Sequence, residues 1–326
     1  MSTAPEHVPT WARTARAPAK LNLGLSVGPV RAADARHELV TVMQSLTLAD
    51  TLTLLPAGAG AQGDELLCDG VDGPPEDNLA ARALALFRAQ TGWSAPPLLL
   101  SVEKRIPVAA GLAGGSADAA ATLRLCSAAS GGLGGGELLR EMAASLGADV
   151  PAQLEPGRWL ASGAGELLEA LPAPVDPVEV LLLPSEAGLA TAAVYAEADR
   201  LGLPRPREEL EARRSRLALE LSDGAPLPVG ELLENDLQDA AVSLCPEISA
   251  ALEQARAAGA AAALVCGSGP TVAALFGGAH ARDRLDAAEQ RLAARTPPVI
   301  RCRSVVAGFG APLRSWGTRI PGRPRA

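Results

Sequence analysis

The sequence predicts an α+β fold, arranged as one large domain or two modest ones. Strand-like and helix-like segments are mixed along the chain without the strict alternation that is typical of a doubly wound parallel sheet. The chain has 326 residues, of which 48% are hydrophobic, and this is enough for one large core or two modest ones. A short proline-rich segment at 171–180 is the best candidate for a boundary between domains.

In the first half of the chain, periodicity and capping predict the elements. A strand is expected where apolar side chains alternate with small or polar ones, and a helix where an Asp or Asn cap precedes a segment that a glycine ends. Asp77 or Asn78 is such a cap, and Gly92 and Gly147 are such ends. The expected strands span 17–30, 39–56 and 98–107, and the expected helices span 76–92 and 135–147.

In the second half, prolines and glycines delimit the elements. Pro246 in a first turn and Gly259 at an end bound one helix, and a charged, proline-flanked stretch suits another helix followed by an exposed loop. An uncharged segment contains CGSGPT at its centre, which favours a strand, a tight turn and a strand over a membrane span. These elements span 246–259, 204–228 and 261–276, and further strands are expected at 178–184 and 299–307.

Charge and cysteine content argue against several classes of function. The net charge of −8 argues against DNA or RNA as a partner, and only the arginines of the C-terminal tail favour one. The five cysteines lie far apart, so reduced thiols in a cytoplasmic protein are expected rather than a zinc site. Residues 1–15 lack the apolar segment of a secretory signal, and we expect a disordered arm there and a disordered tail at 312–326.

The use of lysine is unusual. Lys20 and Lys104 are the only lysines among 29 basic residues, which leaves 27 arginines. Lysine is a compact charge on a thin stem, whereas arginine presents a broad planar fork, so a lysine in this chain suggests a place where a guanidinium would not fit. For Lys104, in the strand-like SVEKRIP, chance is a sufficient explanation.

A glycine-rich loop, PVAAGLAGGSA at 107–117, lies between a predicted strand and a helix that begins near Ser116. Glycines let backbone N–H groups approach a ligand closely, and the start of a helix adds a partial positive charge, so the loop suits phosphate. No lysine follows Gly115 and the pattern is not GxGxxG, so neither a P-loop NTPase nor a dinucleotide-binding fold is supported. A packing turn without a ligand is the alternative.

Five segments resemble motifs of the GHMP kinase superfamily, and they occur in the order of that family between residues 17 and 271. The segments are PVAAGLAGGSADAA, which is similar to the phosphate-binding motif, and APAKLNLGLSV, LGADVP, NDLQ and GSGPT. The resemblance covers nearly the whole chain apart from its two ends. It implies a two-domain α+β architecture, with an N-terminal domain at 16–172 like ribosomal protein S5 and a ferredoxin-like C-terminal domain at 173–311.

The resemblance implies that ATP and Mg²⁺ are used to phosphorylate a hydroxyl group of a small-molecule substrate, a polyol linked to cytidine diphosphate, in the non-mevalonate route to isoprenoids. It implies that Asp149 accepts the hydroxyl proton, that Lys20 lies beside it, and that Ser116 is the protein neighbour of Mg²⁺. The residues implied for ATP are Pro107, Val108, Ala109, Ala110, Gly111, Leu112, Ala113, Gly114, Gly115, Ser116 and Ala117 at the phosphates, and Asn78 and Leu79 near the adenine.

The resemblance also implies contacts with the substrate. One family element differs here, because it reads Asp-Gly-Tyr-His in the family and Arg36 replaces the tyrosine that stacks on the pyrimidine. A guanidinium also stacks on aromatic rings, so recognition of the ring can persist. The implied contacts are Asn22, His37, Thr191, Tyr195, Gly267 and Gly269.

Each of these positions has a structural alternative. Taken alone, Asp149 could be a turn residue, Lys20 a surface residue of a strand, Asn78 only a helix cap, and Tyr195 a half-buried residue of a helix. Two alternative functions follow, a GHMP kinase of different substrate and a non-catalytic nucleotide-binding protein. The presence of both Lys20 and Asp149 argues against the second, because a protein that only binds nucleotide needs no base.

Overall fold

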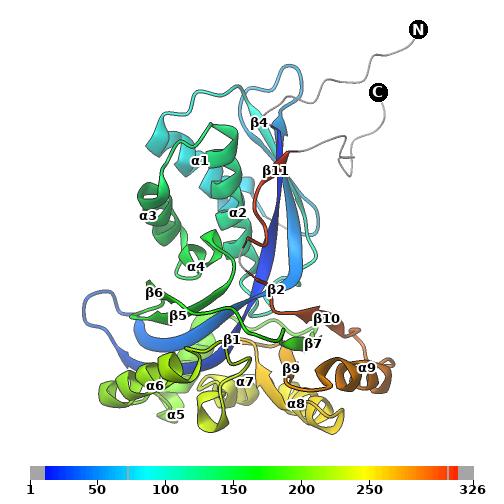
Figure 1. Cartoon of the computed structure of the whole chain (residues 1–326). Coiled ribbons are helices and arrows are strands. Elements are labelled where there is room, and N and C mark those ends of the chain that lie inside the picture. Colours follow the sequence, from blue (N-terminus) through cyan, green and yellow to red (C-terminus); the bar gives the residue numbers. More distant parts are fainter. Residues whose placement is uncertain (1–11, 72, 307, 315–326) are drawn as a thin grey trace.

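Two β-sheets organise the part of the chain that the computed structural model describes, which is residues 12–71, 73–306 and 308–314 (Figure 1). The larger sheet contains β1 (Arg13–Val30), β2 (His37–Pro56), β3 (Glu65–Cys68), β4 (Leu98–Glu103), β5 (Arg158–Ser162), β6 (Leu167–Ala170) and β11 (Leu313–Arg314), in the order β11-β1-β2-β4-β3 with β5 pairing β2 and β6. The smaller, antiparallel sheet contains β7 (Glu179–Leu183), β8 (Ala262–Val265), β9 (Val272–Phe276) and β10 (Ile300–Arg303), in the order β10-β7-β9-β8.

The long antiparallel pair of β1 and β2 runs through both halves of the molecule (Figure 1). Its register is irregular between Pro18 and Lys20 and again between Asn22 and Leu25. Such irregularities bend a strand and change the direction of nearby side chains. Lys20 and Asn22 lie between the two irregularities, and because they are two residues apart they face the same side of the sheet.

Helices cover both sheets. The first group packs on one face of the larger sheet, while the second group lies against the smaller sheet and the adjoining parts of β1 and β2 (Figure 1). The first group is α1 (Leu79–Thr91), α2 (Gly114–Ala129), α3 (Gly136–Leu146) and α4 (Val150–Leu154). The second group is α5 (Thr191–Leu201), α6 (Arg207–Glu220), α7 (Gln238–Leu244), α8 (Glu247–Ala257) and α9 (Ala281–Arg291). Short 3₁₀ helices occupy Pro75–Asp77 and Gly230–Leu232.

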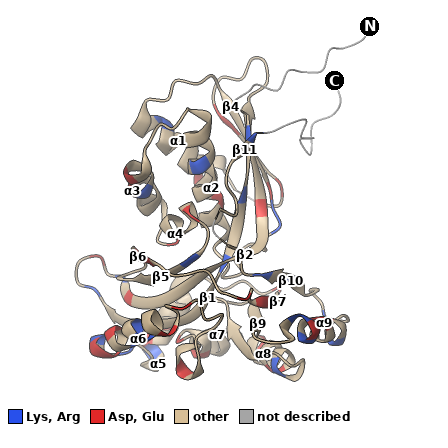
Figure 2. Cartoon of the chain, viewed as in Figure 1, with Lys and Arg blue, Asp and Glu red and all other residues tan. Residues whose placement is uncertain are grey.

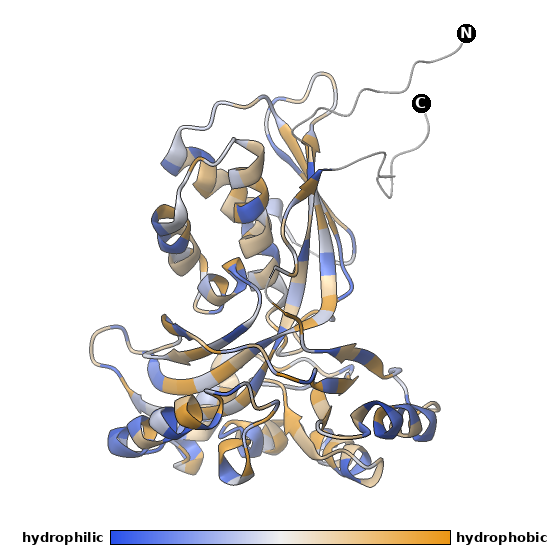
Figure 3. Cartoon of the chain, viewed as in Figure 1, coloured by the Kyte–Doolittle hydropathy of each residue, from blue (hydrophilic) through white to orange (hydrophobic). Residues whose placement is uncertain are grey.

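Alanine, leucine and valine form the cores. In α2 a run of buried alanines, 119–121, lets the helix lie close to α1 and to the larger sheet. A second core contains Leu21 and Val42 from the larger sheet together with Val180 and Ala273 from the smaller one, so the two sheets share a packed interior. Hydrophobic residues follow the central strands, whereas α9 is hydrophilic along most of its visible length (Figure 3).

The α+β prediction is confirmed, and each expected strand and helix is present with ends shifted by a few residues. Several elements were not predicted, among them the strands β3, β5 and β6 and the helices α4, α7 and α9. The three strands contain four or five residues each, which is too short for a clear alternation of apolar and polar side chains. Their pairing with longer neighbours, rather than their own pattern, defines them as strands.

Both predicted disordered ends overlap an ordered strand pair. Leu313 and Arg314, in the predicted tail at 312–326, pair with Thr14 and Arg13, which lie in the predicted arm at 1–15. Residues 315–326 of that tail and residues 1–11 lie outside the described residues. All five cysteines are free thiols, and four of them are buried. Among the described helices, none is both long and apolar enough to cross a membrane.

Candidate active site

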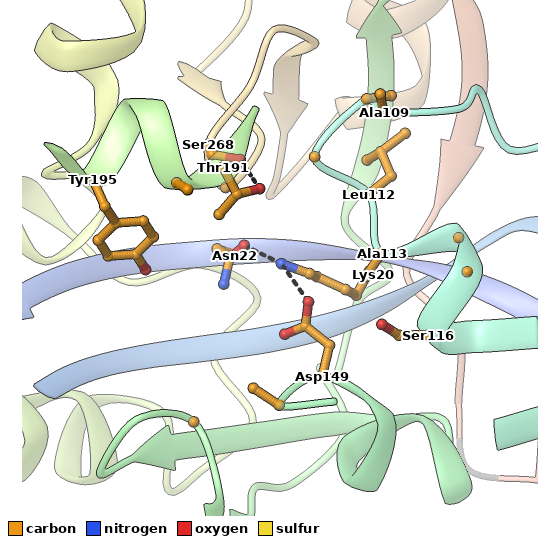
Figure 4. A pocket seen from close by; sticks show the side chains of 18 of the residues that line it. Lys20, Asn22, Ala109, Leu112, Ala113, Ser116, Asp149, Thr191, Tyr195 and Ser268 are labelled. Carbon is orange, nitrogen blue, oxygen red and sulfur yellow. Dashed lines mark hydrogen bonds and ion pairs between the residues drawn. The ribbon is translucent and has the colours of Figure 1, made fainter. Parts of the chain in front are cut away.

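A cavity of about 1000 Å³ brings together residues that are far apart in the sequence. Its walls come from β1 and β2, the glycine-rich loop, the turn before α4, α5 and the loop between β8 and β9. The close view in Figure 4 shows Lys20 and Asn22 on β1, Ser116 at the start of α2, Asp149 before α4, Thr191 and Tyr195 on α5, and Ser268 on the β8–β9 loop.

Lys20 and Asp149 face each other across this cavity (Figure 4). The Nζ atom of Lys20 lies 3.7 Å from Oδ2 of Asp149, and the two side chains are 9% and 32% exposed. Lys20 is therefore not a surface residue of a strand. Asp149 is the residue before α4, but its side chain makes no capping hydrogen bond, so its carboxylate remains directed toward the lysine.

Asn22 orients the lysine through a chain of hydrogen bonds. Lys20 Nζ donates to Asn22 Oδ1 at 2.7 Å, and Asn22 Nδ2 donates to the Thr41 hydroxyl at 2.8 Å. That hydroxyl in turn donates to the Gly24 carbonyl at 2.7 Å. Because Thr41 accepts from the amide nitrogen of Asn22, the amide oxygen must point to the ammonium group. Sequence reasoning missed Thr41, which no motif marks.

The glycine-rich loop connects β4 to α2 and approaches the β8–β9 loop very closely. Gly111 has φ 76°, and a Cβ atom added there would lie 1.9 Å from the carbonyl oxygen of Cys266. A Cβ atom on Gly267 would in turn lie 3.2 Å from the Gly111 carbonyl oxygen and 3.6 Å from Lys20 Nζ. Glycine at 111 is thus required by a contact between loops that lie 155 residues apart (266 − 111).

The start of α2 is open to the cavity. The helix begins at Gly114, and Ala113 before it has φ 55° and provides no side-chain cap, so the N–H groups of the first turn lack helical partners. Gly114, Gly115 and Ser116 all line the cavity. Ala117, which was predicted to contact ATP, is fully buried in the core and does not line the cavity, so that residue assignment is not supported.

Asn78 and Leu79, predicted to lie near the adenine, line the same cavity. The side chain of Asn78 also caps α1, because its Oδ1 accepts a hydrogen bond from the N–H group of Ala80 at 2.9 Å. Asn78 therefore caps α1 and lines the cavity at the same time. A Cβ atom on Gly115 would lie 3.6 Å from Leu79, so the start of α1 and the start of α2 share this side of the cavity.

The explanation of Lys104 by chance is wrong. Its Nζ lies 2.5 Å from Oδ2 of Asp50 and 2.7 Å from Oδ2 of Asp118, and all three side chains are nearly buried. Burial raises the pKa of Asp118 to about 7 although the Lys104 charge acts in the opposite direction. The rarity of lysine, which drew attention to Lys20, was the signal that could also have identified Lys104.

At the other end of the cavity His37 and Tyr195 are adjacent, with ring centroids 5.2 Å apart. Both ring nitrogens of His37 have neighbours, since Nδ1 lies 2.8 Å from the Gly28 carbonyl and Nε2 lies 3.3 Å from a carboxylate oxygen of Asp199. A hydrogen bond from this ring to a pyrimidine would therefore have to compete with Asp199. Arg36 donates to the Ala164 carbonyl at 2.5 Å and lines the cavity.

The β8–β9 loop is held against the cavity by Asn235 of the NDLQ segment, whose Nδ2 donates to the carbonyls of Val265 and Gly267. Gly267 lines the cavity, as does Ser268, whose hydroxyl lies 3.0 Å from that of Thr191. Gly269, a predicted substrate contact, does not line it, since it packs toward Val265. GSGPT is a turn between two strands and part of the cavity wall at once.

The residues present fit a nucleoside triphosphate with Mg²⁺. Open helix N–H groups, together with the ammonium group of Lys20, provide the donors and charge that phosphate requires. Within the described residues there is no group of three or more His, Cys, Asp and Glu that suits a metal ion. That is compatible with Mg²⁺, which is commonly held by substrate phosphates and one or two protein oxygens, and the Ser116 hydroxyl at the helix start is such an oxygen.

Comparison with known proteins points to one family. The model of the GHMP kinases N terminal domain matches residues 78–157, and that of the GHMP kinases C terminal domain matches residues 217–296. The chain is 44% identical over 303 residues to the 4-diphosphocytidyl-2-C-methyl-D-erythritol kinase of Streptomyces coelicolor, covering 91% of this chain and 96% of that protein. It is 44% identical over 281 residues to the enzyme of the same name from Thermobifida fusca, covering 83% and 89%.

Solved structures agree. The crystal structure of a 4-(cytidine 5'-diphospho)-2C-methyl-D-erythritol kinase matches with a TM-score of 0.70 and 32% identity, covering 89% of this chain and 98% of that one. Homoserine kinase from Cytophaga hutchinsonii matches with a TM-score of 0.68 at 15% identity, covering 96% and 99%, and this likeness concerns the fold alone.

Proposed function

Because the chain belongs to the GHMP kinase family, we propose that it transfers the γ-phosphoryl group of ATP to the 2-hydroxyl group of 4-diphosphocytidyl-2-C-methyl-D-erythritol. Relatives of 40–44% identity that extend over most of the chain carry the name of that kinase. One observation in the structure carries the proposal, namely that Lys20 and Asp149 meet beside an open helix start that suits phosphate.

In this mechanism Asp149 accepts the proton of the attacking hydroxyl group, and Lys20 donates a hydrogen bond to the same oxygen and compensates its negative charge. The Asn22 chain of hydrogen bonds holds the ammonium group in place, so that little reorganisation is needed. The N–H groups at the start of α2 bind phosphate oxygens. Bound Mg²⁺ would neutralise phosphate charge, with the Ser116 hydroxyl as its protein neighbour.

The distal half of the cavity is the proposed binding site of the cytidine end. Tyr195 offers an aromatic face there, and Arg36 offers a guanidinium group on a neighbouring segment. Burial, together with the charge of Asp149, raises the pKa of Tyr195 to about 12, so the phenol stays neutral and can donate a hydrogen bond. The engagement of His37 with Asp199, and Arg36 in place of the family tyrosine, are the features that favour a kinase of altered substrate.

We also propose that the enzyme works in the cytoplasm on small molecules and not on nucleic acid. Five free cysteines suit a reducing compartment. Figure 2 shows Lys and Arg interspersed with Asp and Glu along the described helices and strands, and the net charge of −8 does not suit a nucleic-acid backbone.

The test is a coupled assay of ADP release with purified protein, ATP and Mg²⁺. The substrates compared are 4-diphosphocytidyl-2-C-methyl-D-erythritol, mevalonate, homoserine and no acceptor. We expect turnover with the cytidyl substrate to exceed turnover with the other two by at least about a hundredfold. Equal turnover with another acceptor would favour the kinase of different substrate, and nucleotide binding without any turnover would favour the non-catalytic alternative.

A further inference from the structure

A buried cluster of three charged residues lies beside the phosphate loop and takes no part in the proposed proton transfer. Asp50 comes from β2, Lys104 follows β4, and Asp118 belongs to the second turn of α2. The side chain of Asp50 is fully buried, and those of Asp118 and Lys104 are only 5% and 13% exposed. The cluster therefore joins the three elements that meet where the loop begins and ends.

Asp50 holds the entrance of the loop. While its Oδ2 contacts Lys104, its Oδ1 accepts hydrogen bonds from the backbone N–H groups of Arg105 at 2.5 Å and Ile106 at 2.8 Å. Ile106 is buried and packs against the start of α2, where a Cβ atom on Gly114 would lie 3.1 Å from its side chain. The position of the loop entrance thus depends on Asp50, and through Lys104 on α2.

Lys104 supplies the only positive charge of this three-residue cluster and compensates part of the negative charge of the two carboxylates. Two buried carboxylates share one ammonium group, and without it they would repel each other at the place where phosphate binds. The second oxygen of Asp118, Oδ1, is buried and has no hydrogen-bond partner, and Asp118 lines the cavity. The charged and titratable groups that act on Asp118 are Lys104, Asp50 and the Cys68 thiol of β3.

We propose that Lys104 is a positioning residue for nucleotide binding, which ties α2 to the loop entrance so that the open N–H groups of the helix converge on the phosphates. The inference rests on the proposed ATP site. A lysine suits this place because its Nζ lies only 3.5 Å from where a Cβ atom of Gly114 would be, and a guanidinium fork would crowd the helix start. Both lysines of the chain therefore line one cavity, one beside the reacting hydroxyl group and one behind the loop.

The experiment compares Lys104→Met with Arg105→Met, which removes an exposed cation one residue away. Binding of a non-hydrolysable ATP analogue is measured by calorimetry, and kcat and the KM for ATP are measured by the coupled assay. For Lys104→Met we expect the Kd and the KM to rise roughly tenfold to a hundredfold, with kcat at saturating ATP changed far less. For Arg105→Met we expect values within about twofold of the unmodified protein.

A pH series adds a readout that a general loss of stability would not change. Lys104 lowers the pKa of Asp118, so in Lys104→Met this pKa rises further and Asp118 takes up a proton more readily as the pH falls. Protonation removes one of the two uncompensated charges, so the defect of Lys104→Met relative to the unmodified protein should shrink as the pH is lowered. In the double variant Lys104→Met with Asp118→Asn, analogue binding should be partly restored and the relative defect should no longer depend on pH.

Three results would overturn the inference. In the first, Lys104→Met binds the analogue as tightly as the unmodified protein does. In the second, its Kd is raised no more than that of Arg105→Met. In the third, the double variant binds the analogue no more tightly than Lys104→Met at any pH. If Lys104→Met does not fold, the double variant, which lacks the unpaired Asp118 carboxylate, carries the test alone. A Kd more than threefold above that of the unmodified protein then supports the inference, and a Kd within threefold overturns it. If the unmodified protein itself fails to bind the analogue, the proposed function fails instead.

Discussion

Replacing Gly111 with alanine tests the contact between the glycine-rich loop and the β8–β9 loop. The new Cβ atom would lie 1.9 Å from the carbonyl oxygen of Cys266, while real Cβ atoms stay at least 3.0 Å from such an atom, so one backbone must retreat by about 1 Å. Gly111 also has φ 76°, and alanine in that left-handed region costs about 1 kcal/mol more than glycine. Gly267 follows Cys266 in the β8–β9 loop and lies near Lys20 Nζ. A shift of that loop away from Gly111 therefore changes the surroundings of Lys20.

A displacement of about 1 Å at a reacting centre reduces the rate on the order of a hundredfold, so we expect kcat/KM of Gly111→Ala to fall by about that factor. The matched control is Gly60→Ala, since Gly60 also has a positive φ, 90°, but has nothing within 4 Å of an added Cβ atom. The coupled assay, with thermal unfolding of both variants, compares the two. If Gly111→Ala retains the kcat/KM of Gly60→Ala, the contact between the loops does not position the site.

Three further predictions concern the same cavity. Asp149→Asn should lower kcat by roughly two to four orders of magnitude while ATP affinity stays nearly unchanged, and near-normal turnover would contradict its role as the base. Gly114→Val should weaken ATP binding in calorimetry, because its branched side chain meets Ile106 and blocks the backbone; unchanged affinity would contradict the phosphate site. Burial raises the pKa of Asp118 from 3.8 to about 7, so this carboxyl contributes stability that is complete below about pH 4 and lost as the pH rises through 7. Asp118→Asn should therefore show a smaller fall of the unfolding temperature between about pH 4 and pH 7, and equal slopes in calorimetry would refute this.

The parts of the site that sequence reasoning found are those written in short contiguous motifs. The glycine-rich loop, Lys20 with Asn22, and Asp149 each stand in a segment whose residue types indicate their chemistry, and the structure brings them to one cavity. The assignments that the structure does not support, Ala117 and Gly269, come from the same motifs. A motif identifies a loop, but which of its residues face inward depends on how the loop packs.

The remaining features are set by contacts across the fold. Thr41 orients Asn22 from the neighbouring strand, and Asp199 engages His37 from a helix that follows more than 150 residues later. Nothing near these residues in the sequence indicates either contact, because a hydrogen bond between distant segments leaves no periodic pattern. For Lys104 the composition contained a signal, but its two carboxylate partners could be identified only once β2, β4 and α2 were placed together.

By itself the sequence determined the fold class and most strands and helices, because periodicity, capping and glycine content act over a few neighbouring residues. The glycine-rich loop and four other short segments indicated the family through their resemblance to its motifs. Only the tertiary structure decided that Lys20 meets Asp149, that Gly111 touches Cys266, and that a buried ammonium group joins two carboxylates behind the loop. These depend on the register of β1 and β2 and on how closely two loops approach, and both are properties of long-range packing that no local segment encodes.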